Sequence, residues 1–113
     1  MHEMSLAQGV IDVIADEARR QAFTGVKRVV LEVGALGCVD PHALAFGFDA
    51  VARDTLVQGA VLSIVNVPGQ ARCFGCEQDV VIAKRGDPCP ACGSHQLVVT
   101  AGEELRIKEL EVV

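Results

Sequence analysis

The sequence CFGC at Cys73–Cys76, followed after twelve residues by CPACG at Cys89–Gly93, places four cysteines in two C-x-x-C motifs. A gap of two residues lets both sulfur atoms of a motif reach one ion at about 2.3 Å, and two such motifs complete a tetrahedron. Redox dithiols and a disulfide-stapled loop are the alternatives, but neither accounts for two symmetrical pairs in an acidic chain expected in the cytosol. The spacing therefore predicts a zinc site with four thiolate ligands. These ligands are Cys73, Cys76, Cys89 and Cys92.

This zinc is expected to be structural, because four protein ligands leave no open coordination position for a substrate. Its apparent binding energy, of order 10 kcal/mol, is then folding energy for the segment that carries the cysteines. That segment, residues 69–99, contains four glycines and two prolines and shows little apolar periodicity, which indicates that the metal replaces a hydrophobic core. The twelve residues between the motifs leave room for a β-hairpin between the two knuckles.

The composition indicates a small globular protein with an aliphatic core. The chain has 113 residues, half of them apolar, with a mean hydropathy of +0.35, so it has the means to bury a core. A net charge of −5 and the absence of Trp and Tyr argue against a nucleic-acid surface. No apolar run is long enough for a membrane helix, and Glu3 stands where a signal peptide carries basic residues. We therefore expect a cytoplasmic protein.

The apolar spacing outside the cysteine segment predicts two helices and three strands. The elements are a helix over 4–22, a strand over 26–33, a helix after Asp40-Pro41, a strand over 60–67 and a strand over 105–113. Ser5 and Gln8 fit a capping box, which leaves residues 1–3 as a free arm. The apolar phase of the last strand slips near Lys108 or Glu109, which suggests a bulge.

The order strand, helix, strand favours a parallel pair joined by a crossover, and the last strand is expected to return to the same sheet. The predicted fold class is α+β: a small mixed three-stranded sheet with two helices, plus an inserted zinc-ribbon-like four-cysteine domain. The α/β domain is expected to comprise residues 1–68 and 100–113, and the zinc-binding insertion residues 69–99. Hinges are expected at Pro68-Gly69 and at Gly102.

The first three residues, Met1-His2-Glu3, form a chelating arrangement, because a histidine follows directly after a free amine. The Met1 amine and the His2 amide nitrogen close a five-membered ring on a metal, and that amide closes a six-membered ring with His2 Nδ1. Amide nitrogens lose their protons readily to Cu(II) or Ni(II) and generally not to zinc. The arm therefore makes the α/β domain a candidate for binding Cu(II) or Ni(II). The fourth donor stays open among water, Glu3, His42, His95 and a partner protein.

Several further motifs follow one another along the chain: Met1–Leu6, Val33–Val39, Leu44-Ala45-Phe46 with Thr55 and Gly59-Ala60, both knuckles, and Gly102–Leu105. Together they resemble the HypA/HybF family of hydrogenase maturation proteins from end to end. The resemblance implies a nickel metallochaperone and not an enzyme. Its task would be to deliver Ni(II) to the large-subunit precursor of [NiFe] hydrogenase together with a HypB-type GTPase, and some relatives also serve urease.

The same resemblance implies the role of each metal. His2 is the implied nickel ligand, with the Met1 amine and Glu3 beside it as an auxiliary site. Ni(II) is the transferred cargo, and Zn(II) on the four cysteines is structural. Because a carrier must release its cargo, we expect micromolar nickel affinity, about −8 kcal/mol.

Two other classes of function remain open at this point. One is a zinc-ribbon interaction or adaptor module in which the arm is inert and no nickel is transferred. The other is a thiol enzyme that uses one C-x-x-C pair, which needs a lowered thiolate pKa and a site without tightly held zinc. Cys38, the fifth cysteine, is expected to be a small buried apolar residue without a role.

Overall fold

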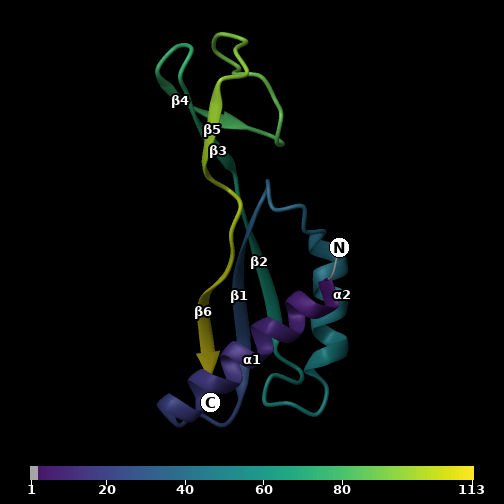
Figure 1. Cartoon of the computed structure of the whole chain (residues 1–113). Helices are drawn as coiled ribbons and strands as arrows, with labels where there is room; N and C mark the ends of the chain where they lie inside the picture. The colour runs from purple at the N-terminus through teal and green to yellow at the C-terminus, as the bar shows by residue number, and fades with distance from the viewer. Residues whose placement is uncertain (1–2) are drawn as a thin grey trace. The chain divides into compact units, whose positions relative to one another are not determined.

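The structure is a computed structural model, and it describes residues 3–113. Within that range the chain forms two helices and six strands (Figure 1). The elements are α1 (Glu3–Gln21), β1 (Val26–Gly34), α2 (Pro41–Ala52), β2 (Val61–Val67), β3 (Gly69–Cys73), β4 (Gln78–Ile82), β5 (Leu97–Ala101) and β6 (Leu105–Val112). Neither helix in this range has the length and hydropathy that crossing a membrane requires.

The chain divides into two compact units. The first contains the residues up to Leu31, together with Val39–Val65 and Arg106–Val113, and the second contains Glu32–Cys38 and Asn66–Leu105. All four cysteines of the two knuckles lie in the second unit. This unit also takes in the turn that precedes α2 in the sequence. Whether residues 69–99 alone fold as an inserted domain stays a prediction.

The first sheet has the strand order β2-β1-β6, which confirms that the last strand returns to the sheet of the first two. The amide of Ala35, just after β1, donates to the carbonyl of Val67 at the end of β2 (2.9 Å), as expected for parallel strands. By contrast, Thr24 before β1 bonds to Val113 after β6, so β6 runs antiparallel to β1. The sheet is therefore mixed, and the predicted α+β class is confirmed.

Helix α1 begins earlier than its sequence pattern predicts. The capping box expected at Ser5 and Gln8 is wrong, because the helix already includes Glu3 and the Gln8 amide instead donates to a carboxylate one turn further along. The reason lies in the packing of the first turn on α2. A Cβ built on Gly47 would lie 3.1 Å from the Met4 sulfur and 3.5 Å from the Met4 Cα. This close contact extends the helix to Glu3, so the predicted arm loses its third residue.

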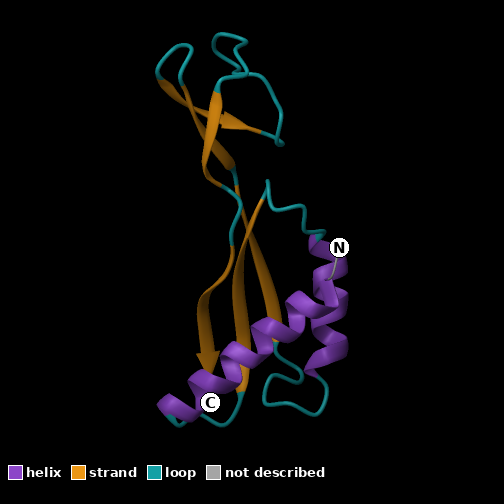
Figure 2. Ribbon diagram, in the orientation of Figure 1, coloured by secondary structure: helices purple, strands orange, loops and turns teal. Residues whose placement is uncertain are grey.

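The core of the first unit lies between the helices and the sheet. Figure 2 shows α1 running diagonally across the strands, and α1 and α2 pack against each other. The fully buried side chains of α1 recur at helical spacing, and those of β1 occupy its centre. They include Ala7, Ile11 and Ile14 of α1, Val29 and Leu31 of β1, and Leu44 and Phe48 of α2. The sequence prediction of an aliphatic core is met by these residues.

Helix α2 begins as the sequence predicts. Asp40 Oδ1 accepts hydrogen bonds from the backbone amides of His42 (2.9 Å) and Ala43 (3.4 Å), and Pro41 occupies the first helical position. Proline has no amide proton to satisfy there, so the cap and the proline act together. This arrangement places His42 in the exposed first turn of the helix.

The second sheet has the order β4-β3-β5 with antiparallel pairs. The hairpin expected between the two knuckles is wrong in position: the β3–β4 hairpin holds the first knuckle in its turn, and only β4 lies between the knuckles. The unit also has a small apolar cluster of its own, formed by Leu36, Ala71 and Ile82. The metal site therefore supplements a core and does not replace it.

Three glycines mark a close backbone contact within the second unit. A Cβ on Gly102 would lie 2.6 Å from the Gly69 Cα, and one on Gly34 would lie 2.7 Å from the Glu103 nitrogen. Gly102 also has a φ of +96°, which favours glycine. The Leu36 amide donates to the Gly102 carbonyl at 2.7 Å in the same place. The residues expected to be hinges thus lie where the backbone is tightly packed.

Candidate metal centre

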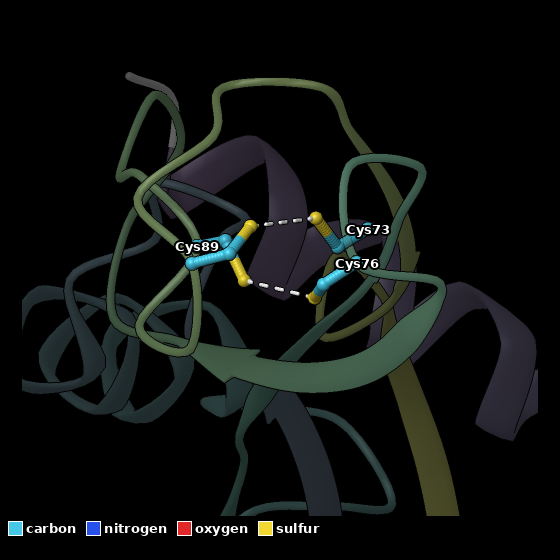
Figure 3. A group of neighbouring side chains, drawn as sticks. Cys73, Cys76 and Cys89 are labelled. Carbon is cyan, nitrogen blue, oxygen red and sulfur yellow. Dashed lines mark hydrogen bonds between the residues drawn. The ribbon is translucent and has the colours of Figure 1, made fainter.

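The four knuckle cysteines come from two places in the second unit. Cys73 is the last residue of β3 and Cys76 lies in the turn before β4, whereas Cys89 and Cys92 lie in the loop between β4 and β5. Figure 3 shows the side chains of Cys73, Cys76 and Cys89 converging on one point. The pairing of β3 with both neighbouring strands brings the two loops to the same end of the sheet.

The distances between the sulfur atoms fit a four-coordinate ion. The Sγ atoms of Cys73 and Cys92 lie 3.6 Å apart and those of Cys76 and Cys89 lie 3.8 Å apart. All four sulfur atoms are within 4.8 Å of one another. A tetrahedron with metal–sulfur bonds of about 2.3 Å has edges of about 3.8 Å, whereas a disulfide requires about 2.05 Å. The donor set and its spacing therefore fit zinc without rearrangement.

Backbone hydrogen bonds hold both knuckles in place. The Cys89 amide donates to the Ser94 carbonyl and the Gly93 amide donates to the Cys89 carbonyl, each at 2.8 Å. Gly93 has a φ of +77°, so the tight return of this loop requires the left-handed conformation that glycine allows. A Cβ on Gly75 of the first knuckle would lie 2.8 Å from the Ser94 Cβ. The two knuckles therefore pack directly on each other.

The four thiols differ in solvent exposure. Cys73 and Cys89 are 0% and 2% exposed, Cys76 is half-buried and Cys92 is exposed. Two ligands are thus enclosed by the unit, and solvent reaches the centre from the side of Cys92. Such a site closes around an ion but leaves a route for the ion to enter.

The environment holds the thiols in different protonation states. Burial, with hydrogen bonds to Cys73 and Cys92, raises the pKa of Cys76 from 9.0 to about 12. Burial is the largest influence on Cys89 and opposes its ionisation, but the backbone hydrogen bonds of Cys92 and Ala91 and the side-chain hydrogen bonds of Cys73 and Cys92 together outweigh it, and the pKa falls to about 7. At Cys92 the Ser94 amide favours the thiolate, yet burial and the contact with Cys73 raise the pKa. Cys76 and Cys92 are therefore protonated at neutral pH until a metal displaces the protons.

The predicted nickel ligands Met1 and His2 lie outside the described residues. Glu3 is the first described residue of α1 and is partly exposed. Among residues 3–113, the only group of three or more metal-ligating side chains is the four-cysteine cluster, and neither His42 nor His95 belongs to it. The nickel site predicted for the arm therefore stays a prediction.

The expectation of a buried Cys38 is wrong. Its side chain is exposed, and its φ of 58° places it in the left-handed conformation. The turn after β1 must reverse the chain before the Asp40 cap, and this reversal directs Cys38 outward.

Sequence reasoning also missed Arg85, whose Nε donates to the Leu36 carbonyl (3.3 Å) and whose guanidinium pairs with Glu103. No pattern within the sequence links residues so far apart in the chain.

Comparisons with known proteins cover nearly the whole chain. A protein-family profile described as hydrogenase/urease nickel incorporation, metallochaperone, hypA matches residues 1–112. The hydrogenase maturation factor HypA of Alkalilimnicola ehrlichii is 56% identical over 112 residues, which is 99% of each chain. The HypA of Azotobacter vinelandii is 50% identical over the same length and coverage.

Solved structures agree with this match. The solution structure of the Ni metallochaperone HypA from Helicobacter pylori is similar to the present structure with a TM-score of 0.73 and 25% sequence identity. The similarity covers 100% of this chain and 98% of that chain. A second solution structure, of a HypA protein, gives a TM-score of 0.72 at 26% identity. The likeness therefore extends over both compact units.

Proposed function

The chain belongs to the HypA family of hydrogenase and urease nickel-incorporation proteins, and we propose that it is a nickel metallochaperone for hydrogenase maturation. The end-to-end match carries this proposal, because relatives named as hydrogenase maturation factors share 99% of their length with this chain. The four-thiolate centre supports it as a second, independent feature. In this function the protein binds and releases a metal ion and catalyses no bond rearrangement.

The proposed division of labour assigns one metal to each unit. Zn(II) sits on Cys73, Cys76, Cys89 and Cys92 and stabilises the second unit, because a closed thiolate set has no position left for exchange. Ni(II) binds to the arm of the first unit through the Met1 amine and His2, with Glu3 beside them. Soft thiolates favour zinc, whereas amine, amide and imidazole nitrogens suit a square-planar nickel ion. The ligand chemistry thus keeps the cargo apart from the structural ion.

The position of Glu3 supports the role of the arm. Helix α1 is packed on α2 through Met4 and Gly47 from its first turn, so Glu3, which follows the proposed ligands in the chain, has a fixed position. An arm with an incomplete ligand set can accept a donor from an acceptor protein before it gives up its own. Nickel transfer then proceeds by ligand exchange and does not require a free aqueous ion.

We further propose that the acceptor is the large-subunit precursor of [NiFe] hydrogenase and that a HypB-type GTPase takes part in delivery. The support for these partners is the resemblance to the family and the maturation role in the names of the relatives. We place this work in the cytoplasm, where thiols persist as metal ligands because the compartment is reducing.

The experiment that tests the function is nickel titration of the untagged, zinc-loaded protein. We expect one bound Ni(II) with micromolar affinity, its loss in the His2→Ala variant, and unchanged zinc content by elemental analysis. Asp49→Ala serves as the control, because Asp49 is an exposed residue outside the arm and is not among the donors considered for nickel. Equal nickel binding by wild type and His2→Ala would exclude the arm as the site.

The zinc-ribbon adaptor without nickel transfer is the second candidate, since the same four-thiolate centre would serve it. The titration separates the two, because an adaptor binds no nickel on its arm.

The pKa values and the solvent exposure of the thiols argue against a thiol enzyme. Cys89, whose pKa is lowered, is buried, and exposed Cys92 has a raised pKa. A reactive thiolate must be both ionised and accessible.

A further inference from the structure

The second unit contains a cavity that the metal centre does not use. Its volume is about 280 Å³, and its lining comes from the end of β4, the loop after it and β5. Ligand sites for drug-sized molecules range from about 300 to 1,000 Å³. The size of this cavity therefore suits a small molecule or a single side chain.

The floor of the cavity is aliphatic. Ile82, Leu97 and Val99 line it, and strand register places all three on one face of the sheet. Ile82 pairs with Gly69, Val99 with Ala71, and Leu97 with the last residue of β3, so their partners alternate along β3. The same three side chains belong to the apolar cluster of the unit or pack against it. Water next to these aliphatic side chains finds no hydrogen-bond partners on them. Binding of an aliphatic group that displaces this water is therefore favourable in free energy.

The rim of the cavity is polar and carries a cation held in a fixed position. Arg85 donates from Nε to the Leu36 carbonyl (3.3 Å) and pairs through one terminal nitrogen with Glu103. Neither of these contacts uses its other terminal nitrogen, Nη1. A guanidinium anchored in this way can take a carboxylate without first losing side-chain freedom.

The hydrogen-bond donors on the rim, and not its net charge, select the ligand. Arg85 and Asp87 are the oppositely charged residues that line the cavity, and Glu103 pairs with Arg85 from outside the lining. Asp87 Oδ2 accepts hydrogen bonds from the amides of Ala83 and Lys84, both at 3.2 Å, and these donors offset its charge. His95 also lines the rim, and its ring has no hydrogen-bond partner within the described part of the chain. The groups left to meet a ligand are therefore mainly donors.

We propose that this cavity binds a small aliphatic carboxylate, with the aliphatic group on Ile82, Leu97 and Val99 and the carboxylate paired with Arg85. Two sources offer this chemistry: a free branched acid, and a leucine next to an aspartate in a peptide. The cavity lining includes no residue of the proposed nickel arm, so its occupancy can be measured without nickel.

The test is a methyl NMR titration of the full-length, zinc-loaded protein with matched probes. For 4-methylpentanoate we expect saturable shifts at Ile82, Leu97 and Val99 with millimolar affinity. The neutral amide, 4-methylpentanamide, is expected to bind about fivefold more weakly, because it lacks the charged partner for Arg85. Acetate is expected to give no saturable shift, because it has no aliphatic group for the floor. The peptide acetyl-Leu-Asp-amide, compared with 4-methylpentanoate, shows which source binds more tightly.

Two variants identify the role of the cation. Arg85→Gln is expected to reduce binding of 4-methylpentanoate to the level of the amide and to leave binding of the amide unchanged. Lys84→Gln is the matched control, because Lys84 is the adjacent cation and does not line the cavity. The methyl signals of Val98, which is exposed on β5 and does not line the cavity, should not move.

The proposal is overturned if the acid and the amide bind equally or if Arg85→Gln leaves the affinity for the acid unchanged. It is also overturned if no probe produces saturable shifts at the three floor residues. Because zinc-loaded protein without nickel is used throughout, these outcomes do not depend on whether the chain carries nickel.

Discussion

At the scale of single residues, the thiols show why the metal centre depends on pH. Cys76 has a pKa raised to about 12 by burial, and the pKa of Cys92 is raised as well. Both sulfur atoms are therefore protonated at neutral pH. Their protons compete with the metal ion for the sulfur lone pairs. Cys89, with a pKa near 7, is the thiol most ready to bind first.

From these protonation states we predict that zinc binding at pH 7 releases at least two protons, from Cys76 and Cys92. Because protons compete with the ion, affinity should fall as the pH is lowered, by about 100-fold per unit for two protons. Calorimetry in two buffers of different ionisation enthalpy counts the protons directly. A release of fewer than two would contradict the thiol assignment.

The glycines of the second unit give a second prediction at the same scale. Gly102→Ala should destabilise the protein by about 3 kcal/mol or more, because the new methyl group meets the backbone at Gly69. Gly86→Ala is the matched control: its φ of +86° resembles the +96° of Gly102, but no atom lies within 4 Å of the added Cβ. The Gly86→Ala substitution should lower the free energy of unfolding by only about 1 kcal/mol.

Urea unfolding of the zinc-loaded variants measures the difference between the two glycines. Equal losses of stability would mean that positive φ alone, and not the backbone contact, makes Gly102 necessary. A larger loss for Gly102→Ala isolates the contribution of the close approach.

At the scale of helices and strands, the cap of α2 is the contact with the clearest stabilising role. Asp40→Ala should lower stability by about 1 kcal/mol, because the amides of His42 and Ala43 lose their acceptor. Asp40→Asn should retain most of the stability, since asparagine caps as well. The exposed Asp49→Ala, in the same helix, is the control and should change stability by less than about 0.5 kcal/mol. Thermal unfolding that is equal for both alanine variants would argue against the cap.

Local signals explain which elements were predictable from the sequence. Asp40-Pro41 and the valine-rich apolar run of β1 act through neighbouring residues, so the start of α2 and the strand were correctly predicted. The start of α1 was not, because it depends on contact with Gly47, far along the chain. The hairpin was misplaced for the same reason: pairing of β3 with β4 is a tertiary choice.

The same difference between local signals and tertiary contacts applies to the candidate site. The C-x-x-C spacing identified all four thiols that converge in the structure, because each pair is local and one ion can bind both pairs. The cavity, the anchoring of Arg85 and the exposure of Cys38 depend on which surfaces fold together. Nickel binding by the arm, residues 1–3, stays a prediction.

At the scale of the whole molecule, the chain combines a unit built on helices and a mixed sheet with a unit built around four thiols. The proposed function requires that each unit holds its own metal. Nitrogen donors of the arm and sulfur donors of the knuckles differ in the ions that they favour, so a single chain can hold a structural ion and a transferable one.

X-ray absorption at both metal edges tests this claim most directly, using untagged protein loaded with one Zn(II) and one Ni(II). The zinc spectrum should show four sulfur ligands at about 2.3 Å, and the nickel spectrum should show only nitrogen and oxygen ligands. Sulfur in the nickel shell, or nitrogen in the zinc shell, would contradict the assignment of one metal to each unit.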